Sequence, residues 1–116
     1  MAILNTGLAR ERDLISADIS SGVAGTGTTA IAFTQTSLVS EDSSVTDSTP
    51  TNELSEQTIV INTSISPAAG NGNTYTEWGI KGNSDSTLYT RTLSAGVIKN
   101  SSIEVNRVDT WYFDRE

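Results

Sequence analysis

Residues 73–93, NTYTEWGIKGNSDSTLYTRTL, are the stretch that decides the fold. The turn residues Gly82-Asn83-Ser84-Asp85 separate two segments rich in β-branched and aromatic residues, which is the pattern of a β-hairpin. If residues 83–85 form the loop, Gly82 faces Ser86. The resulting register sets Ile80 against Leu88, Trp78 against Thr90, Tyr75 against Leu93, Glu77 against Arg91, and Gly79 against Tyr89. We therefore predict a β-hairpin around which the rest of the fold is organised.

Glu77 and Arg91 are the most informative pair of this register. A carboxylate beside a guanidinium can belong to an active site, but an opposite-charge pair on neighbouring strands is also a common structural ion pair, worth roughly 0.2–1 kcal/mol. No nucleophile or second carboxylate lies near either residue in the sequence. We therefore favour a structural ion pair.

The composition restricts the chemistry. One domain, residues 1–116, is long enough to bury its own core, and it contains no cysteine and no histidine. Thiolate chemistry, disulfides, the commonest general base and the commonest transition-metal ligand are therefore missing. We predict no catalytic, cofactor-binding or metal site and no enzymatic activity. An enzyme that uses carboxylates alone, such as Glu77 with Glu104, is the alternative.

The formal net charge of -7 argues against nucleic acid and anionic membranes as partners. An acidic, lysine-poor and threonine-rich chain fits a protein kept soluble in high salt, and it also fits an ordinary acidic surface. No apolar run approaches the roughly 20 residues needed to span a membrane. The first five residues lack the features of a signal peptide, so we expect synthesis as a soluble protein in the cytoplasm.

The N-terminal half predicts a helix, a turn, a strand and a loop. Residues 1–21 form a helix or arm, with a helix over 3–19 that Asn5 caps and a charged run, 10–13, that faces solvent or a partner. The stripe of this helix consists of Leu4, Leu8, Ile15 and Ile19. Residues 25–29, GTGTT, indicate a turn, because a phosphate-binding loop would need a lysine or a third glycine. Residues 30–38 indicate a strand, and residues 39–56 an exposed acidic loop without the ligand spacing of a calcium site.

The C-terminal half predicts more strands. Residues 57–66 alternate as a half-buried, central strand with Ile59, Ile61 and Ile65 inward. A loop (67–73), the hairpin, a turn (94–96) and a short strand (97–98) follow. The last strand, 102–113, has charged residues on its apolar face, which indicates a bulge or an edge position. Six to eight strands predict a mainly β fold: a small antiparallel β-sandwich or jelly-roll-like domain with one N-terminal helix.

Trp111 and Tyr112 in the last strand allow two interpretations. They can form a stacking platform for a glycan, or anchor the strand in the core. We favour the core anchor. A carbohydrate-binding module for host-surface glycans, which would also use Trp78 and Tyr89, is the alternative.

Several short motifs occur in an order that resembles small virion proteins of tailed viruses. They are Asn5-Thr6-Gly7-Leu8, Gly25-Thr26-Gly27-Thr28, Leu38, Glu41, Glu77-Trp78-Gly79-Ile80, Leu88-Tyr89-Thr90-Arg91, Lys99 and Thr110-Trp111. After the position of Glu41 such proteins often carry an arginine, where this chain has Asp42-Ser43-Ser44. The resemblance implies a non-enzymatic structural protein of the virion.

Within the virion, a compact domain without stalk repeats favours an outer-surface capsid decoration or turret subunit. A tail-tip, baseplate or fibre subunit is the alternative. The partners implied are further copies of the chain, in a closed ring, and other capsid or tail proteins.

Overall fold

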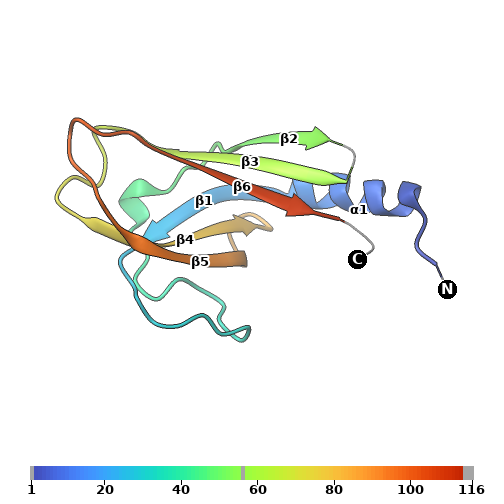
Figure 1. Ribbon diagram of the computed structural model, residues 1–116, viewed down its shortest axis with the longest axis horizontal. Coiled ribbons are helices and arrows are strands. Elements are labelled where there is room, and N and C mark those ends of the chain that lie inside the picture. The colour runs from blue at the N-terminus through green and yellow to red at the C-terminus, as the bar shows by residue number, and fades with distance from the viewer. Residues whose placement is uncertain (1, 56, 114–116) are drawn as a thin grey trace.

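The structure, a computed structural model, describes residues 2–55 and 57–113 and is mainly β with one N-terminal helix (Figure 1). The elements are α1 (Asn5–Asp18), β1 (Ile19–Gly25), the 3₁₀ turn η1 (Ser43–Val45), β2 (Thr51–Ser55), β3 (Thr58–Ile65), β4 (Thr74–Gly82), β5 (Thr87–Ile98) and β6 (Val105–Tyr112). Sheet A has the strand order β1-β4-β5 and sheet B the order β2-β3-β6, and all pairings are antiparallel. The two sheets lie in a sandwich-like arrangement, which confirms the predicted mainly β fold class.

The core lies between the two sheets. Ile59, Ile61 and Ile65 of β3 are buried, as the alternation of this segment predicted, and β3 is the central strand of sheet B. Trp78 and Ile80 of β4 meet them from sheet A. Each of these side chains contributes roughly 1.5–3 kcal/mol by leaving water. Trp78 and Ile80 therefore define the inner face of sheet A, and Glu77 and Gly79, which alternate with them along β4, face outward.

The predicted hairpin is formed by β4 and β5, but the predicted register is wrong. The loop has four residues, 83–86, and two register shifts interrupt the pairing, so that Arg91 lies opposite Gly79 rather than Glu77. The observed pairs are Gly82–Thr87, Lys81–Leu88, Ile80–Thr90, Gly79–Arg91, Trp78–Thr92, Glu77–Leu93, Tyr75–Val97 and Thr74–Ile98. Around Glu77 and Arg91 the pairing differs from the prediction by two residues in total, one from the loop and one from the nearer shift, so both side chains stay on one face.

Hydrogen bonds hold the hairpin loop to the start of β1. Three consecutive non-glycine residues, Asn83, Ser84 and Asp85, have φ angles of 53°, 51° and 70°. This left-handed conformation is unfavourable for L-residues. It is offset by the hydroxyls of Ser20 and Ser21, which donate to Asp85 Oδ1 over 2.5 and 2.7 Å. These bonds, that of Ser20 first, lower the pKa of the Asp85 carboxyl.

The N-terminal segment differs from the prediction for residues 1–21, of which Met1 lies outside the described residues. The helix ends at Asp18, and the chain enters β1 where a turn was predicted. The residues of β1, ISSGVAG, are small and do not alternate, so they carry little strand signal. Their small size lets the sheets approach, because a Cβ added to Gly22 would lie 2.8 Å from Cβ of Thr63 in β3.

The helix α1 projects from one end of the sandwich and lengthens the molecule to 51 × 28 × 24 Å (Figure 1). Of the predicted stripe, Leu8 is buried and Ile15 and Ile19 pack on the core, but Leu4 is exposed. Asn5 is not the cap, since Leu4 occupies that position without a side-chain hydrogen bond.

Residues 30–38 form a loop, so the strand predicted there is wrong. Residues 39–56, of which Glu56 lies outside the described residues, are more ordered than an exposed acidic loop. They contain η1 and β2, Val45 is buried in the core, and Glu41 and Asp47 form isolated bridges with β1. This segment therefore covers the outer edge of β1.

The last two strands also differ in extent from the prediction. The predicted turn at 94–96 lies within β5, where the Ser94 hydroxyl accepts a 2.8 Å hydrogen bond from the Trp78 indole. β6 pairs with β3 in one continuous register at the edge of sheet B, which is the predicted edge position. Arg107 and Asp109 form an ion pair of 2.8 Å there.

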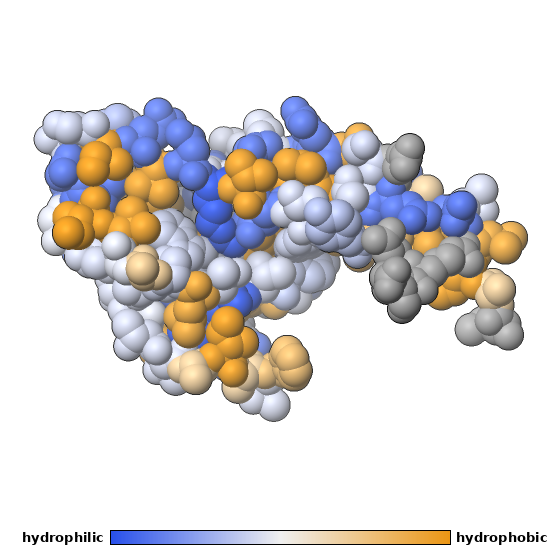
Figure 2. All heavy atoms as spheres, in the orientation of Figure 1, coloured by the Kyte–Doolittle hydropathy of each residue, from blue (hydrophilic) through white to orange (hydrophobic). Residues whose placement is uncertain are grey.

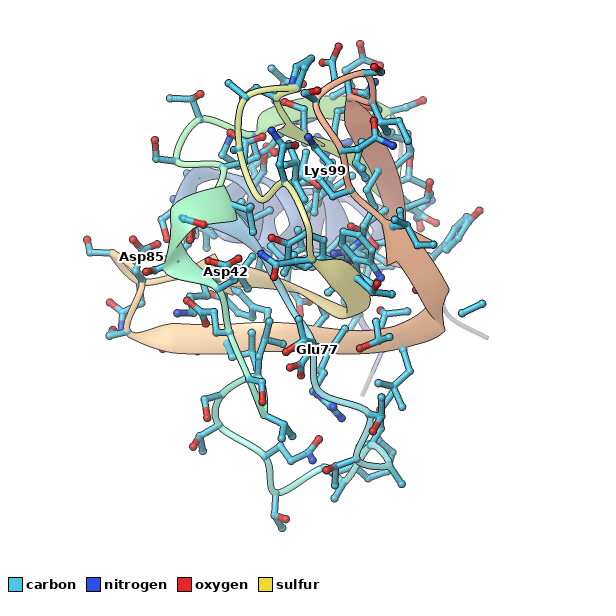
Figure 3. The ribbon with its side chains drawn as sticks, turned by 90° about the vertical axis from the view of Figure 1, so that its left-hand side faces the viewer. Asp42, Glu77, Asp85 and Lys99 are labelled. Atoms are coloured by element: carbon cyan, nitrogen blue, oxygen red, sulfur yellow. The ribbon has the colours of Figure 1, made fainter. Side chains whose placement is uncertain are left out.

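Lys99 is a buried cation that joins the two loops at the end of the sandwich opposite α1 (Figure 3). Its ammonium donates to three oxygens, the carbonyls of Pro67 (3.1 Å) and Asn100 (3.0 Å) and the side chain of Asn71 (2.9 Å). Three oxygens match the three donors of a lysine, which allows its charge to be buried.

We predict that Lys99→Met lowers the free energy of unfolding by about 2–4 kcal/mol, because it leaves buried carbonyl oxygens without a donor. Urea unfolding measures the change. Lys81→Met is the matched control: Lys81 pairs with Glu41 over 2.9 Å in a partly exposed position, and its loss should cost about 1 kcal/mol or less. Equal effects of the two substitutions would contradict the role of Lys99.

Candidate functional site

The outer face of sheet A is covered by residues 26–40, which we call the covering loop. Glu77 directly precedes the inward-facing Trp78 in β4 and therefore points away from sheet B. Figure 3 shows its side chain directed from the sheet toward this loop. The loop buries Glu77 completely, at 0% exposure. The covering loop thus adds a third layer to the two sheets.

Four donors surround the Glu77 carboxylate. The backbone amides of Gly27 and Ser40 donate to Oε2 over 2.8 and 2.7 Å, and that of Val39 donates to Oε1 over 2.8 Å. Arg91 Nε donates to Oε1 over 2.9 Å. Because Gly27 belongs to the first part of the loop and Val39 and Ser40 to its end, one carboxylate holds both ends of the loop against the sheet.

These donors decide the charge state of Glu77. Burial raises the pKa of its carboxyl, because a low-dielectric surrounding disfavours the anion. The hydrogen bonds from Ser40, Arg91, Val39 and Gly27 together outweigh burial and leave the pKa below its ordinary value. Glu77 is therefore an anion at neutral pH, and its charge is used to hold the loop.

Arg91 extends the same network into the middle of the covering loop. Its Nη1 donates to the carbonyl of Thr29 over 2.8 Å and to Oε1 of Gln35 over 3.3 Å. Gln35 in turn accepts from the amide of Ala32 and donates to the carbonyl of Ala30. The backbone of residues 29–35 is thus held by side chains rather than by a neighbouring strand.

The covering loop presents an apolar tip to solvent. Ile31 is 49% exposed and Phe33 is fully exposed. A groove of about 390 Å³ separates the tip from β5 and is lined by residues 31–33, Gln35 and residues 88–92. In Figure 2, hydrophobic spheres gather in the lower part of the view, where Figure 1 places the loop and β5. No residue from 26 to 40 is charged, although the chain has 14 acidic residues.

The glycines of the GTG motif are required by this network. A Cβ on Gly27 would collide with Glu77 Oε2 and lie 2.7 Å from Cβ of Val39. A Cβ on Gly25 would collide with the carbonyl oxygen of Ser40 and lie 2.7 Å from Glu77 Oε2. The motif therefore allows close approach to a carboxylate of the protein itself.

The structure brings together one of the two predicted residue pairs. Glu77 and Arg91 form the expected ion pair, as diagonal neighbours on one face, with side chains 0% and 3% exposed. Trp111 and Tyr112 are adjacent in β6 and so lie on opposite faces. Trp111 packs on the core and edge-on to Tyr89, with ring centroids 5.9 Å apart, whereas Tyr112 is 69% exposed.

The two residues therefore share no stacking platform, and Trp78, a third residue of that hypothesis, is buried in the core. Glycan binding stays a prediction. Of the alternative carboxylate pair, Glu77 is enclosed by its four donors, and Glu104 is exposed ahead of β6.

The covering loop was not predicted from the sequence, because its decisive donors are backbone amides. The one available signal is an uncharged run from residue 19 to residue 40 in a strongly acidic chain, but residues 57–76 are also uncharged, so this signal does not single out the loop.

Within residues 2–55 and 57–113, no three acidic, cysteine or histidine side chains are grouped as metal ligands would be. In the same residues, no helix has the length and apolarity to cross a membrane. Comparison of the chain with protein-family models, curated proteins and solved structures gave no match.

We predict that Glu77→Gln lowers the free energy of unfolding by about 3–5 kcal/mol at neutral pH, because it leaves Arg91 buried without its anion. The amides of Gly27, Val39 and Ser40 should also exchange hydrogen faster. Glu53→Gln, an exposed carboxylate of β2, is the matched control and should change stability by less than about 0.5 kcal/mol.

The pH dependence follows from the lowered pKa of Glu77. A lowered pKa in the folded state gives stability above the ordinary titration range of glutamate, near pH 4, and this stability is lost as pH falls through the folded pKa. The difference between wild type and Glu77→Gln should therefore shrink in acid. A difference that is constant with pH would contradict an ionised Glu77.

We predict that Gly27→Ala destabilises the protein by about 1–3 kcal/mol, since the added Cβ displaces Glu77 or Val39. Gly7→Ala is the control in an open helical position, where Cβ meets only Ile3 at 3.6 Å, and it should stabilise by up to about 1 kcal/mol. Thermal unfolding of both variants distinguishes a steric requirement at Gly27 from a general effect of removing glycine.

Proposed function

We propose that this protein is a non-enzymatic structural subunit of a tailed-virus particle, an outer-surface capsid decoration or turret subunit that binds neighbouring proteins through the tip of the covering loop. The observation that carries the proposal is the exposed apolar tip, Ile31 to Phe33, on a loop held to the sheet by the buried Glu77.

The hydrogen bonds that hold the covering loop in place keep its apolar tip exposed to solvent. A flexible loop can turn an aromatic side chain back onto its own protein and so remove it from water. Here the bonds to Glu77 and Arg91 hold both ends and the middle of the loop. Exposed apolar patches on a rigid frame are typical of interaction sites, and aromatic residues are enriched in them.

The placement on a virus particle rests on the resemblance of the ordered motifs. The geometry adds that two of these motifs act together: Gly25-Thr26-Gly27-Thr28 and Glu77-Trp78-Gly79-Ile80 meet where Gly27 donates to Glu77. A tail-tip subunit would use the same surface with another partner. A glycan-binding role would instead use Tyr112, which is exposed on the outer face of sheet B.

We predict that Phe33→Ser lowers the amount of this protein in purified particles at least tenfold, a loss expected for an interface anchor. Mass spectrometry of gradient-purified particles measures it, and thermal unfolding should be unchanged. Val108→Ser removes an apolar side chain that is 61% exposed on sheet B, and this control should leave incorporation intact. Absence of the wild-type protein from purified particles would overturn the proposal.

A further inference from the structure

The two edge strands of sheet A, β1 and β5, differ in whether the backbone of their outer side is already hydrogen-bonded. The outer edge of β1 is occupied, because Thr26 donates to the carbonyl of Ser40, Asp42 donates to that of Ala24, and Gly22 and Asp47 exchange two hydrogen bonds. β5 is the other edge strand, and within residues 2–55 and 57–113 only β4 pairs with it. A free edge strand presents unpaired amides and carbonyls, which can pair with another strand.

β5 lacks two features that commonly protect an edge strand, a lysine and a proline, and its irregularities are confined to two register shifts. β2 is only five residues long, and β6 carries the ion-paired Arg107 and Asp109 on its inner face. β5 has twelve residues, neither proline nor lysine, and a regular stretch from Thr90 to Leu93 between its two register shifts. The stretch from Thr90 to Leu93 is thus the part of the β5 edge that is open to regular pairing.

The surface around this edge is nearly free of charge. Residues 26–40 and 86–98 contain a single charged residue, Arg91, and the buried Glu77 compensates it. The remaining charged residues lie elsewhere on a chain of net charge -7. Two copies therefore repel each other in most orientations and can approach across this face without like-charge contact.

We propose that two copies of this chain pair antiparallel through the free edges of β5, with the apolar tip of each covering loop packed against its partner. The edge of a strand is complementary to itself about a two-fold axis, so identical copies satisfy each other's amides and carbonyls. The contact also removes Ile31 and Phe33 of both copies from water. The inference rests on the proposed function only in assigning the same face to protein binding.

The mass of the protein in solution tests this pairing. Sedimentation of the wild type should give a dimer at about 100 µM. Thr92→Lys places a charge on the exposed edge of β5 and should weaken the dimer at least tenfold. Thr110→Lys makes the same change at an exposed position of β6 and should leave the dimer intact. A monomeric wild type, or equal effects of the two substitutions, would overturn the proposal.

Cysteine cross-linking tests the register, because the chain has no cysteine of its own. Single cysteines placed from residue 88 to 94 should give disulfide-linked dimers most readily at the position on the two-fold axis, where the Cα atoms lie within about 7 Å. Cross-linking that does not vary along β5 would contradict a fixed pairing. A monomer that still enters particles would overturn the dimer alone, whereas a dimer absent from particles would overturn the proposed function alone.

Discussion

The buried carboxylate of Glu77 is the constraint on which the outer face of sheet A depends. Moving an ionised carboxylate out of water is expensive by several kcal/mol, and the expense is recovered only if nearly every lone pair receives a donor. Three of the four donors are amides of the covering loop and the fourth is Arg91. The loop amides therefore stabilise the buried carboxylate of the sheet, and that carboxylate in turn holds the loop in place.

The sequence predicted the elements whose signals are local. β3 was found because its isoleucines alternate, and the hairpin because turn residues separate two β-rich segments. The register failed because bulges depend on what packs on the sheet, which no pattern in the hairpin shows. The ion pair was still found, since its two residues stay on one face when a strand shifts by two. β1 was missed because its small residues have little strand propensity. Their small size is required by close contact with Thr63 and Glu77.

The candidate site was harder to predict than the fold for a chemical reason. Residues 30–38 are rich in β-branched and apolar residues, which favours a strand when no partner is known. Here the side chain of Gln35 bonds to the backbone of Ala30 and Ala32, and Arg91 bonds to that of Thr29, where a strand would have a neighbouring strand. Backbone amides are present in every residue, so no sequence pattern marks those of Val39 and Ser40 as the ligands of a carboxylate.

The distribution of charge over the surface bears on the proposed association of two copies of the chain. Several acidic side chains hold turns at the surface, where the half-buried Asp42 accepts from Ser44 and Tyr75 and the exposed Asp85 accepts from Ser20 and Ser21. The acidic residues give the exterior its negative charge, whereas residues 26–40 and β5 form a nearly neutral, apolar face. Added salt screens repulsion between the acidic surfaces, with a Debye length of about 3 Å at 1 M, and kosmotropic salts also strengthen apolar burial. Both effects favour contact across the neutral face, so we expect the proposed pairing through the covering loop and β5 to strengthen as salt rises.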